Sequence, residues 1–159
     1  TNMAFVPGVD GSLADKLNVP AGGSRYPASQ YTIDNDMHSM DMDGNIIKDN
    51  AIKRMVEVTK KALEESGVPM EEVALFKPHQ ANLSIIQATA DSLKFPMERV
   101  MVTIDKYGNT SSASIPTALR EAWDADRIKR NDIMVVATFG AGLEYIAAVL
   151  PMVGLPKKK

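Results

Sequence analysis

The sequence has 159 residues, of which 45% are hydrophobic, so it is long enough to form a single domain with its own core. Its net charge of −2 and pI of about 5.7 argue against a nucleic-acid-binding domain, which usually carries a basic face. There is no run of about 18 apolar residues, so no membrane span is expected. The chain has no cysteine, which excludes disulfides, cysteine-ligated zinc and a thiol nucleophile from it.

The N-terminal third has little regular patterning. Residues 1–31 are rich in proline and glycine and are predicted to be a loop-rich lead-in, in which only Met3 to Val6 has the pattern of a strand. The start lacks a signal-peptide pattern, and the protein is predicted to be cytoplasmic. Because Thr1 is not an initiator methionine, we expect that an upstream segment has been removed.

Weak alternation predicts a short strand from about Tyr31 to Met42. His38 in this stretch is interpreted as a surface histidine. The four aspartates nearby do not follow the spacing of a calcium-binding loop, and they are interpreted as solvated charges: Asp34, Asp36, Asp41 and Asp43.

The middle of the chain alternates between helix and strand patterns. A helix is predicted over Asp49–Ser66, capped by Asp49 or Asn50 and ended by Gly67, with an apolar stripe of Ile52, Met55, Val56, Thr59 and Leu63. A short strand, Ala74–Phe76, is stopped by Pro78, and a helix follows over about Asn82–Lys94.

The last third continues the alternation. Val100–Ile104 is rich in β-branched residues and is predicted to be a strand, followed by a helix that reaches about Ala125 and tolerates Pro116 in its first turn. Asp132–Phe139, the turn Gly140-Ala141-Gly142 and Leu143–Leu150 are predicted to form a hairpin. The fold class is therefore α/β, with a mixed sheet of about five strands and helices on both faces.

Three of the predicted turns carry polar or glycine residues to one edge of this sheet, where α/β proteins bind ligands. They hold His79, Asn109 and the turn Gly140-Ala141-Gly142. A neutral histidine and an asparagine amide can both donate to one oxygen, which is the chemistry of an oxyanion site. Alternatively, His79 is an ordinary loop histidine and Asn109 a turn former. The two histidines are far apart in sequence, so no metal site is predicted.

Several motifs resemble the 3-oxoacyl-[acyl-carrier-protein] synthase III family. Pro78-His79-Gln80-Ala81-Asn82 resembles its Pro-His-Gln-Ala-Asn motif, and the stretch from Tyr107 to Pro116 resembles its second motif. The resemblance continues in order over roughly residues 13–150, through Met42–Asn45, Arg127–Lys129 and Phe139–Leu143. It implies the C-terminal half of the duplicated thiolase-like fold, with the N-terminal half absent from this sequence.

This resemblance implies a reaction and a set of partners. Family members take an acyl group from acyl-CoA onto a cysteine and condense it with malonyl-ACP, with decarboxylation, in fatty acid biosynthesis. The implied partners are acyl-CoA, malonyl-ACP and acyl carrier protein, the implied assembly is a homodimer of the full-length protein, and no cofactor is implied. Neither a membrane nor a nucleic acid is an expected partner.

The resemblance also implies residue roles. His79 and Asn109 match the family's hydrogen-bond donors to the malonyl thioester oxygen, and the histidine should be neutral for this task. Ala141, between Gly140 and Gly142, matches the backbone of a second oxyanion hole. The pantetheine-binding positions of the family correspond to Gly44 and Asn82.

The sequence departs from the family pattern in places. The cysteine nucleophile belongs to the absent half, so this chain alone is expected to be inactive. Basic positions that dock an acyl carrier protein are occupied by Ser84, Asp91 and Ser92. The family's Thr-Trp-Gly after the glycine loop is Glu144-Tyr145-Ile146, and Lys48 replaces an aromatic residue. Two alternatives therefore stand beside the main prediction: an acyl-CoA-dependent acyltransferase with a non-ACP acceptor, and a non-catalytic thiolase-fold domain.

Overall fold

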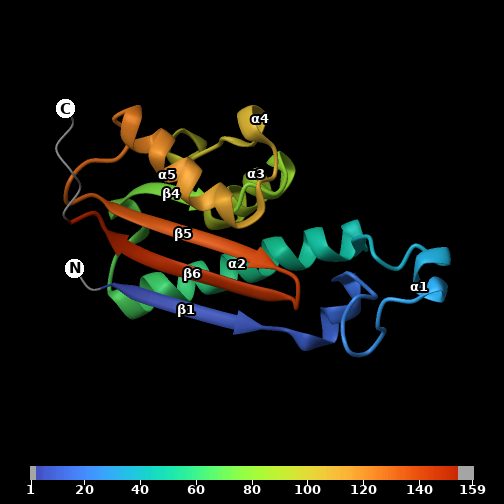
Figure 1. Ribbon diagram of the computed structural model, residues 1–159. Coiled ribbons are helices and arrows are strands. Elements are labelled where there is room, and N and C mark those ends of the chain that lie inside the picture. The colour runs from blue at the N-terminus through green and yellow to red at the C-terminus, as the bar shows by residue number, and fades with distance from the viewer. Residues whose placement is uncertain (1–2, 154–159) are drawn as a thin grey trace.

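The computed structural model describes residues 3–153. Among these residues a four-stranded sheet has the order β1-β6-β5-β4, formed by β1 (Ala4–Val9), β6 (Glu144–Pro151), β5 (Ile133–Gly140) and β4 (Val73–Pro78). β4 and β5 run parallel, whereas β5–β6 and β6–β1 are antiparallel. The sheet is therefore mixed, and the predicted α/β class and the hairpin at residues 140–143 are confirmed (Figure 1).

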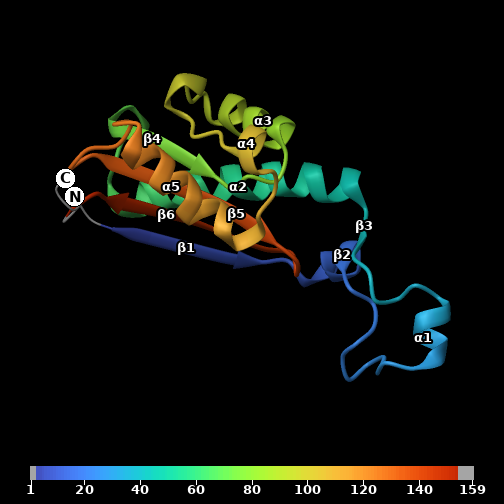
Figure 2. The same cartoon turned by 45° about the horizontal axis from the view of Figure 1, so that its top comes forward.

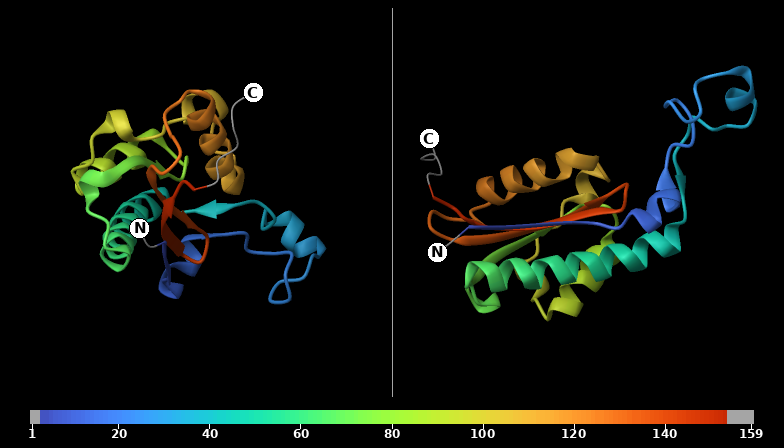
Figure 3. Two further views of the ribbon diagram at one scale, coloured as in Figure 1. Left: turned by 90° about the vertical axis from the view of Figure 1, so that its left-hand side faces the viewer. Right: turned by 90° about the horizontal axis from the view of Figure 1, so that it is seen from below.

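Helices cover both faces of the sheet, as expected. α2 (Gly44–Ser66) and α3 (Leu83–Leu93) pack together on one face, and α5 (Ser114–Asp124) lies on the other (Figure 3). Strand side chains alternate between these faces. On β5, Val135 packs in the core beneath α2 and α3, while Met134 packs in the core beneath α5.

The long helix α2 begins earlier than the apolar stripe predicts. Asp43, rather than Asp49 or Asn50, caps it by accepting a hydrogen bond from the backbone N–H of Ile46 at 3.2 Å. Gly67 ends it in the left-handed conformation with φ of 68°. The extra turn at the start includes Ile47, which is 3% exposed and extends the buried face.

The predicted strand Val100–Ile104 is wrong. Val100 makes one isolated parallel bridge with Phe76, and Ile104 begins the short helix α4 (Ile104–Tyr107). Side chains form hydrogen bonds with the backbone N–H and C=O groups that would pair with a neighbouring strand in a sheet. Arg127 donates to the carbonyls of Glu98 and Val100, and Gln80 binds the backbone of Met101, Thr103 and Ile104. The sheet accordingly has four strands where the sequence predicted about five.

Residues 11–43 form a lobe beyond the end of the sheet, which Figure 2 shows most clearly. The predicted strand from about Tyr31 to Met42 is wrong, because the segment starts with α1 (Gln30–Asp34) and keeps only the two-residue strand β3 (Asp41–Met42), paired with β2 (Leu17–Asn18). Ser29 and Thr32 form a reciprocal capping box that starts α1. The predicted loop-rich lead-in also contains all of β1, which extends beyond Met3–Val6.

No helix within residues 3–153 is long and apolar enough to cross a membrane. The same residues contain no group of three or more histidine, aspartate or glutamate side chains arranged to hold a metal ion. Pro116 lies at the third position of α5, where its missing N–H removes no helical hydrogen bond, as predicted.

Candidate functional site

His79 directly follows β4 and lies at the carboxyl end of the parallel pair β4–β5. Its backbone N–H donates to the carbonyl of Ala137 at 2.8 Å and so extends the sheet by one bond. His79 is 8% exposed, and its ring packs edge-to-face with the ring of Phe139, with 5.4 Å between ring centroids. Nδ1 lies 2.8 Å from the hydroxyl of Ser114 at the start of α5. Burial lowers the pKa of His79 below its usual value, so the ring is neutral near pH 7.

Gln80, the next residue, is fully buried, and both polar atoms of its side chain are hydrogen-bonded. Its amide nitrogen donates to the carbonyls of Pro78 and Met101 at 2.9 and 3.0 Å. Its amide oxygen accepts from the N–H groups of Thr103 and Ile104 at 2.7 and 3.1 Å. One side chain therefore connects the crossing, the loop between β4 and α3 that carries His79, to the segment that leads into α4.

Lys77, two residues before His79, is 1% exposed and faces α5. Its ammonium donates to the carbonyl of Ile115 at 2.8 Å, next to Ser114 in the chain. Removal from water lowers the pKa of Lys77 to about 8. β4 and its crossing thus bind two consecutive residues of α5, through Lys77 and His79. Sequence reasoning missed Lys77, Gln80 and Ser114 as parts of this site. A lysine within an apolar strand was the available signal for the first of them.

Asn109 lies in the exposed crossing between α4 and a 3-10 turn at Ser111–Ala113. Its side-chain oxygen accepts the backbone N–H of Ser111 at 2.9 Å. A backbone N–H can only donate, so this bond identifies which end of the amide is oxygen, and the NH₂ group is a donor with no partner within residues 3–153. Gly108 before it has φ of 66°.

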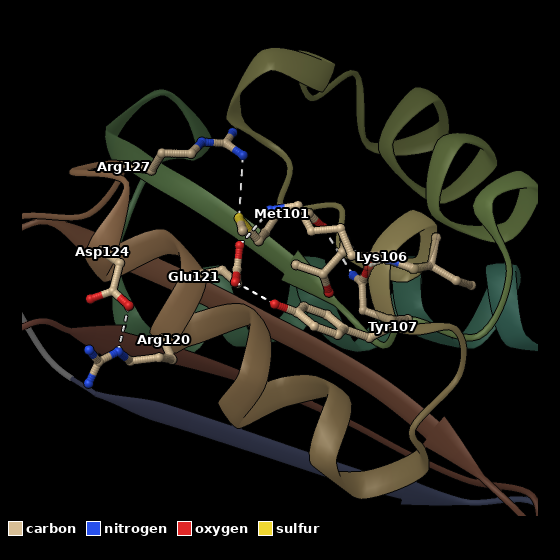
Figure 4. A network of polar contacts seen from close by, with 10 residues as sticks. Met101, Lys106, Tyr107, Arg120, Glu121, Asp124 and Arg127 are labelled. Atoms are coloured by element: carbon tan, nitrogen blue, oxygen red, sulfur yellow. Dashed lines mark hydrogen bonds and ion pairs between the residues drawn. The ribbon is translucent and has the colours of Figure 1, made fainter.

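The crossing that carries Asn109 is attached to α5 by surface contacts. Lys106 and Tyr107 of α4 bind the two carboxylate oxygens of Glu121 at 2.7 and 2.6 Å (Figure 4). The hydrogen bonds to Lys106 and then to Tyr107 lower the pKa of Glu121. His79 and Asn109 make no hydrogen bond with each other within residues 3–153. His79 is instead hydrogen-bonded to Ser114, which follows Asn109 in the chain and is the first residue of α5.

The turn Gly140-Ala141-Gly142 begins where β5 ends. Gly142 has φ of 142°, and a Cβ there would lie 2.9 Å from the backbone nitrogen of Glu144, so the position requires glycine. Leu143 and Asp10 exchange two backbone hydrogen bonds of 2.8 and 3.0 Å, and the carboxylate of Asp10 pairs with Arg54 of α2 at 2.7 Å. The turn is therefore attached to two other segments. Beside it lies a hollow of about 450 Å³ whose lining includes Phe139, Gly140 and Glu144.

The two predicted pantetheine positions lie at helix N-termini. Asn82 caps α3 by accepting the N–H of Ser84 at 2.9 Å, and it is exposed. Gly44 is the first residue of α2, and no atom lies within 4 Å of where its Cβ would be. No hydrogen bond within the described residues connects either of them to His79.

Comparison with known proteins matches the chain to one group of proteins. Residues 63–152 match the family model described as 3-oxoacyl-[acyl-carrier-protein (ACP)] synthase III C terminal. Over 145 residues the chain is 43% identical to beta-ketoacyl-[acyl-carrier-protein] synthase III of a Sulfurovum species, covering 91% of this chain and 43% of that protein. The protein of the same name from Clostridioides difficile is 43% identical over 143 residues, covering 90% of this chain and 44% of its own length.

Solved structures give the same result. The 3-oxoacyl-[acyl-carrier-protein] synthase III of Aquifex aeolicus superposes with a TM-score of 0.81 at 38% identity, covering 93% of this chain and 43% of that chain. The Pseudomonas aeruginosa enzyme superposes with a TM-score of 0.84 at 32% identity, covering 97% of this chain and 45% of that one. The chain spans less than half the length of the curated relatives it matches.

Proposed function

The chain belongs to the 3-oxoacyl-[acyl-carrier-protein] synthase III C-terminal family, and on that premise we propose that it is the C-terminal catalytic half of a condensing acyltransferase. The full-length protein would join an acyl group derived from acyl-CoA to malonyl-ACP in fatty acid biosynthesis. The observation that carries this proposal is the state of His79: it is buried, its pKa is lowered, and its Nδ1 lies 2.8 Å from the hydroxyl of Ser114, so Nε2 is the ring nitrogen without a partner among the described residues.

The chemistry needs a neutral donor at this place. When the malonyl thioester loses CO₂, the electron pair of the broken carbon–carbon bond moves onto the thioester oxygen as an enolate. Hydrogen bonds from His79 and from the free NH₂ group of Asn109 stabilise that developing charge. The enolate carbon then attacks the acyl-cysteine thioester, which releases the cysteine thiolate and gives the 3-oxoacyl thioester. The cysteine is supplied by the N-terminal half of the full-length protein.

We assign the remaining predicted roles on the same basis. The backbone N–H groups of the turn Gly140-Ala141-Gly142 stabilise the oxyanion of the acyl-cysteine thioester. Gly44 and Asn82 contact the pantetheine arm, and both are supported by their exposed positions at helix N-termini. These assignments divide the site into a donor pair for decarboxylation and a backbone site for acyl transfer.

One face of β1 carries exposed apolar side chains, which supports the proposal that another part of the full-length protein packs against it. Ala4 and Val6 on β1 pack beneath α2, so Phe5 and Val9 point to the opposite face, where they are 64% and 67% exposed. An edge strand with large exposed apolar side chains favours a covering segment. We propose that the N-terminal half and the homodimer of the full-length protein bury this face.

The test is to replace His79 by alanine in the full-length protein and to follow CO₂ release from malonyl-ACP. The expected loss is about 10²–10³-fold, the size typical of removing one oxyanion donor. His38→Ala is the matched control, because His38 lies in the lobe and binds Thr32. Decarboxylation by His79→Ala at close to the wild-type rate would overturn the proposal.

One observation favours a second candidate function, acyl transfer to an acceptor that is not a carrier protein. α3 contains no lysine or arginine, and its surface includes Asp91, so an acidic carrier protein finds no basic patch on this helix. Assaying the full-length protein with malonyl-ACP and with small alcohol or amine acceptors separates the two functions. Product formation with malonyl-ACP alone would reject the second.

A further inference from the structure

The hydroxyl of Ser114 has two polar neighbours that restrict where its proton lies. Ser114 is 2% exposed, so water does not replace a missing partner. The backbone N–H of Gln80 donates to its oxygen at 3.5 Å, and Nδ1 of His79 lies 2.8 Å away. Within residues 3–153, Nδ1 is the one acceptor recorded for the hydroxyl proton.

Two arrangements of protons are conceivable for this contact. If Nδ1 carried the proton, the serine oxygen would accept from both His79 and Gln80, and its own O–H would be buried without an acceptor. If the serine donates instead, the hydroxyl, the N–H of Gln80 and Nδ1 are all paired, and the imidazole proton is on Nε2. A buried donor without a partner is costly, and the penalty corresponds to a preference of about ten-fold or more for the second arrangement.

We propose that Ser114 is a positioning residue that holds His79 in the tautomer with its proton on Nε2. This inference deepens the proposed function and rests on it for its catalytic meaning, because that tautomer presents an N–H group to the thioester oxygen. The lowered pKa of His79 supports it, since only a neutral ring has a tautomer to select. Lys77 assists by binding the carbonyl of Ile115, which holds the start of α5 in place.

The tautomer can be measured directly by ¹⁵N NMR of histidine-labelled chain at about pH 8, where the ring is neutral. The chain has two histidines, so a His38→Gln variant leaves the signals of His79 alone. The expected spectrum has a pyrrole-type Nε2 and a pyridine-type Nδ1. A pyrrole-type Nδ1 in the protein with Ser114 intact would overturn the proposal without any further variant.

Variants extend the test. Ser114→Ala should move both nitrogen signals towards a mixture of tautomers, Ser114→Thr should restore the single tautomer, and the exposed Ser112→Ala should leave the spectrum unchanged. An unaltered tautomer in folded Ser114→Ala would contradict the positioning role.

In the full-length protein, Ser114→Ala should lower kcat for malonyl-ACP decarboxylation about ten-fold, with little change in KM. Failure of the proposed function and failure of the role of Ser114 give different results. An active His79→Ala variant would remove the proposed function and leave the spectrum as evidence on the tautomer. A fully active Ser114→Ala beside an inactive His79→Ala would remove only the role of Ser114.

Discussion

His79 follows strand β4 and Asn109 follows helix α4, and the two loops are held in different ways. At His79 the neighbouring side chains are buried and reach across the fold, because Lys77 binds α5 and Gln80 binds the segment before α4. At Asn109 the side chain is exposed and bonds two residues along its own loop. The first donor is therefore positioned by the packing of the core, and the second by local turn geometry and surface contacts.

This difference has a consequence for the proposed mechanism. Because the crossing at His79 is part of the core, damage to its supporting bonds should cost stability as well as activity. Around Asn109 the supporting bonds can be removed with little effect on the rest of the fold. Three further substitutions test this contrast in order of decreasing effect.

The largest effect is expected for Gln80→Leu. It leaves the N–H of Thr103 and the carbonyls of Met101 and Pro78 without their side-chain partner in a buried place. The free energy of unfolding should fall by at least about 3 kcal/mol. Urea titration measures it, with the exposed Gln87→Leu on α3 as a control that changes it by no more than about 0.5 kcal/mol. A loss below about 1 kcal/mol for Gln80→Leu would show that the crossing is held by other contacts.

Lys77→Met should have the next largest effect, and it should stabilise the protein. The pKa of Lys77 in the folded state is about 8, below the usual lysine value of 10.5, so the folded state binds fewer protons than the unfolded state between these values. Stability should therefore rise with pH through this window and stay at its lower level below about pH 8.

Replacing the buried ammonium by an apolar side chain should raise the free energy of unfolding at pH 7 by about 1–3 kcal/mol and remove the rise above pH 8. Urea titrations from pH 7 to about pH 10.5 measure both effects. Lys60→Met, on the exposed face of α2, is the matched control. A destabilised Lys77→Met would mean that its bond to Ile115 outweighs the cost of burying the charge.

The smallest effect on global stability is expected for Glu121→Gln. Its bonds to Lys106 and Tyr107 are exposed, so the melting temperature should fall slightly and the difference should shrink at high salt. Amide hydrogen exchange should quicken locally in residues 104–110. Asp124→Asn, which breaks the pair with Arg120 within α5, should leave that loop unchanged. Exchange that also quickens at His79 would show that the two crossings are coupled.

The sequence alone determined most of the framework. Helical periodicity located α2 and α3, and a continuous apolar run with a glycine turn located the β5–β6 hairpin, because these signals depend on residues close together in the chain. The motif around His79 led to the family, which the comparisons confirm. The roles of His79, Asn109, Gly44, Asn82 and the glycine turn remain predictions.

Tertiary structure decided what holds the site. Val100–Ile104 has strand propensity, yet Gln80 and Arg127 bind its backbone and keep it out of the sheet. Ser114 reaches His79 across 35 residues of sequence, and Lys77 reaches Ile115 across 38. Hydrogen bonds between a side chain and a distant segment leave no periodic pattern in the sequence, because their partners become neighbours only when β4 and α5 pack together.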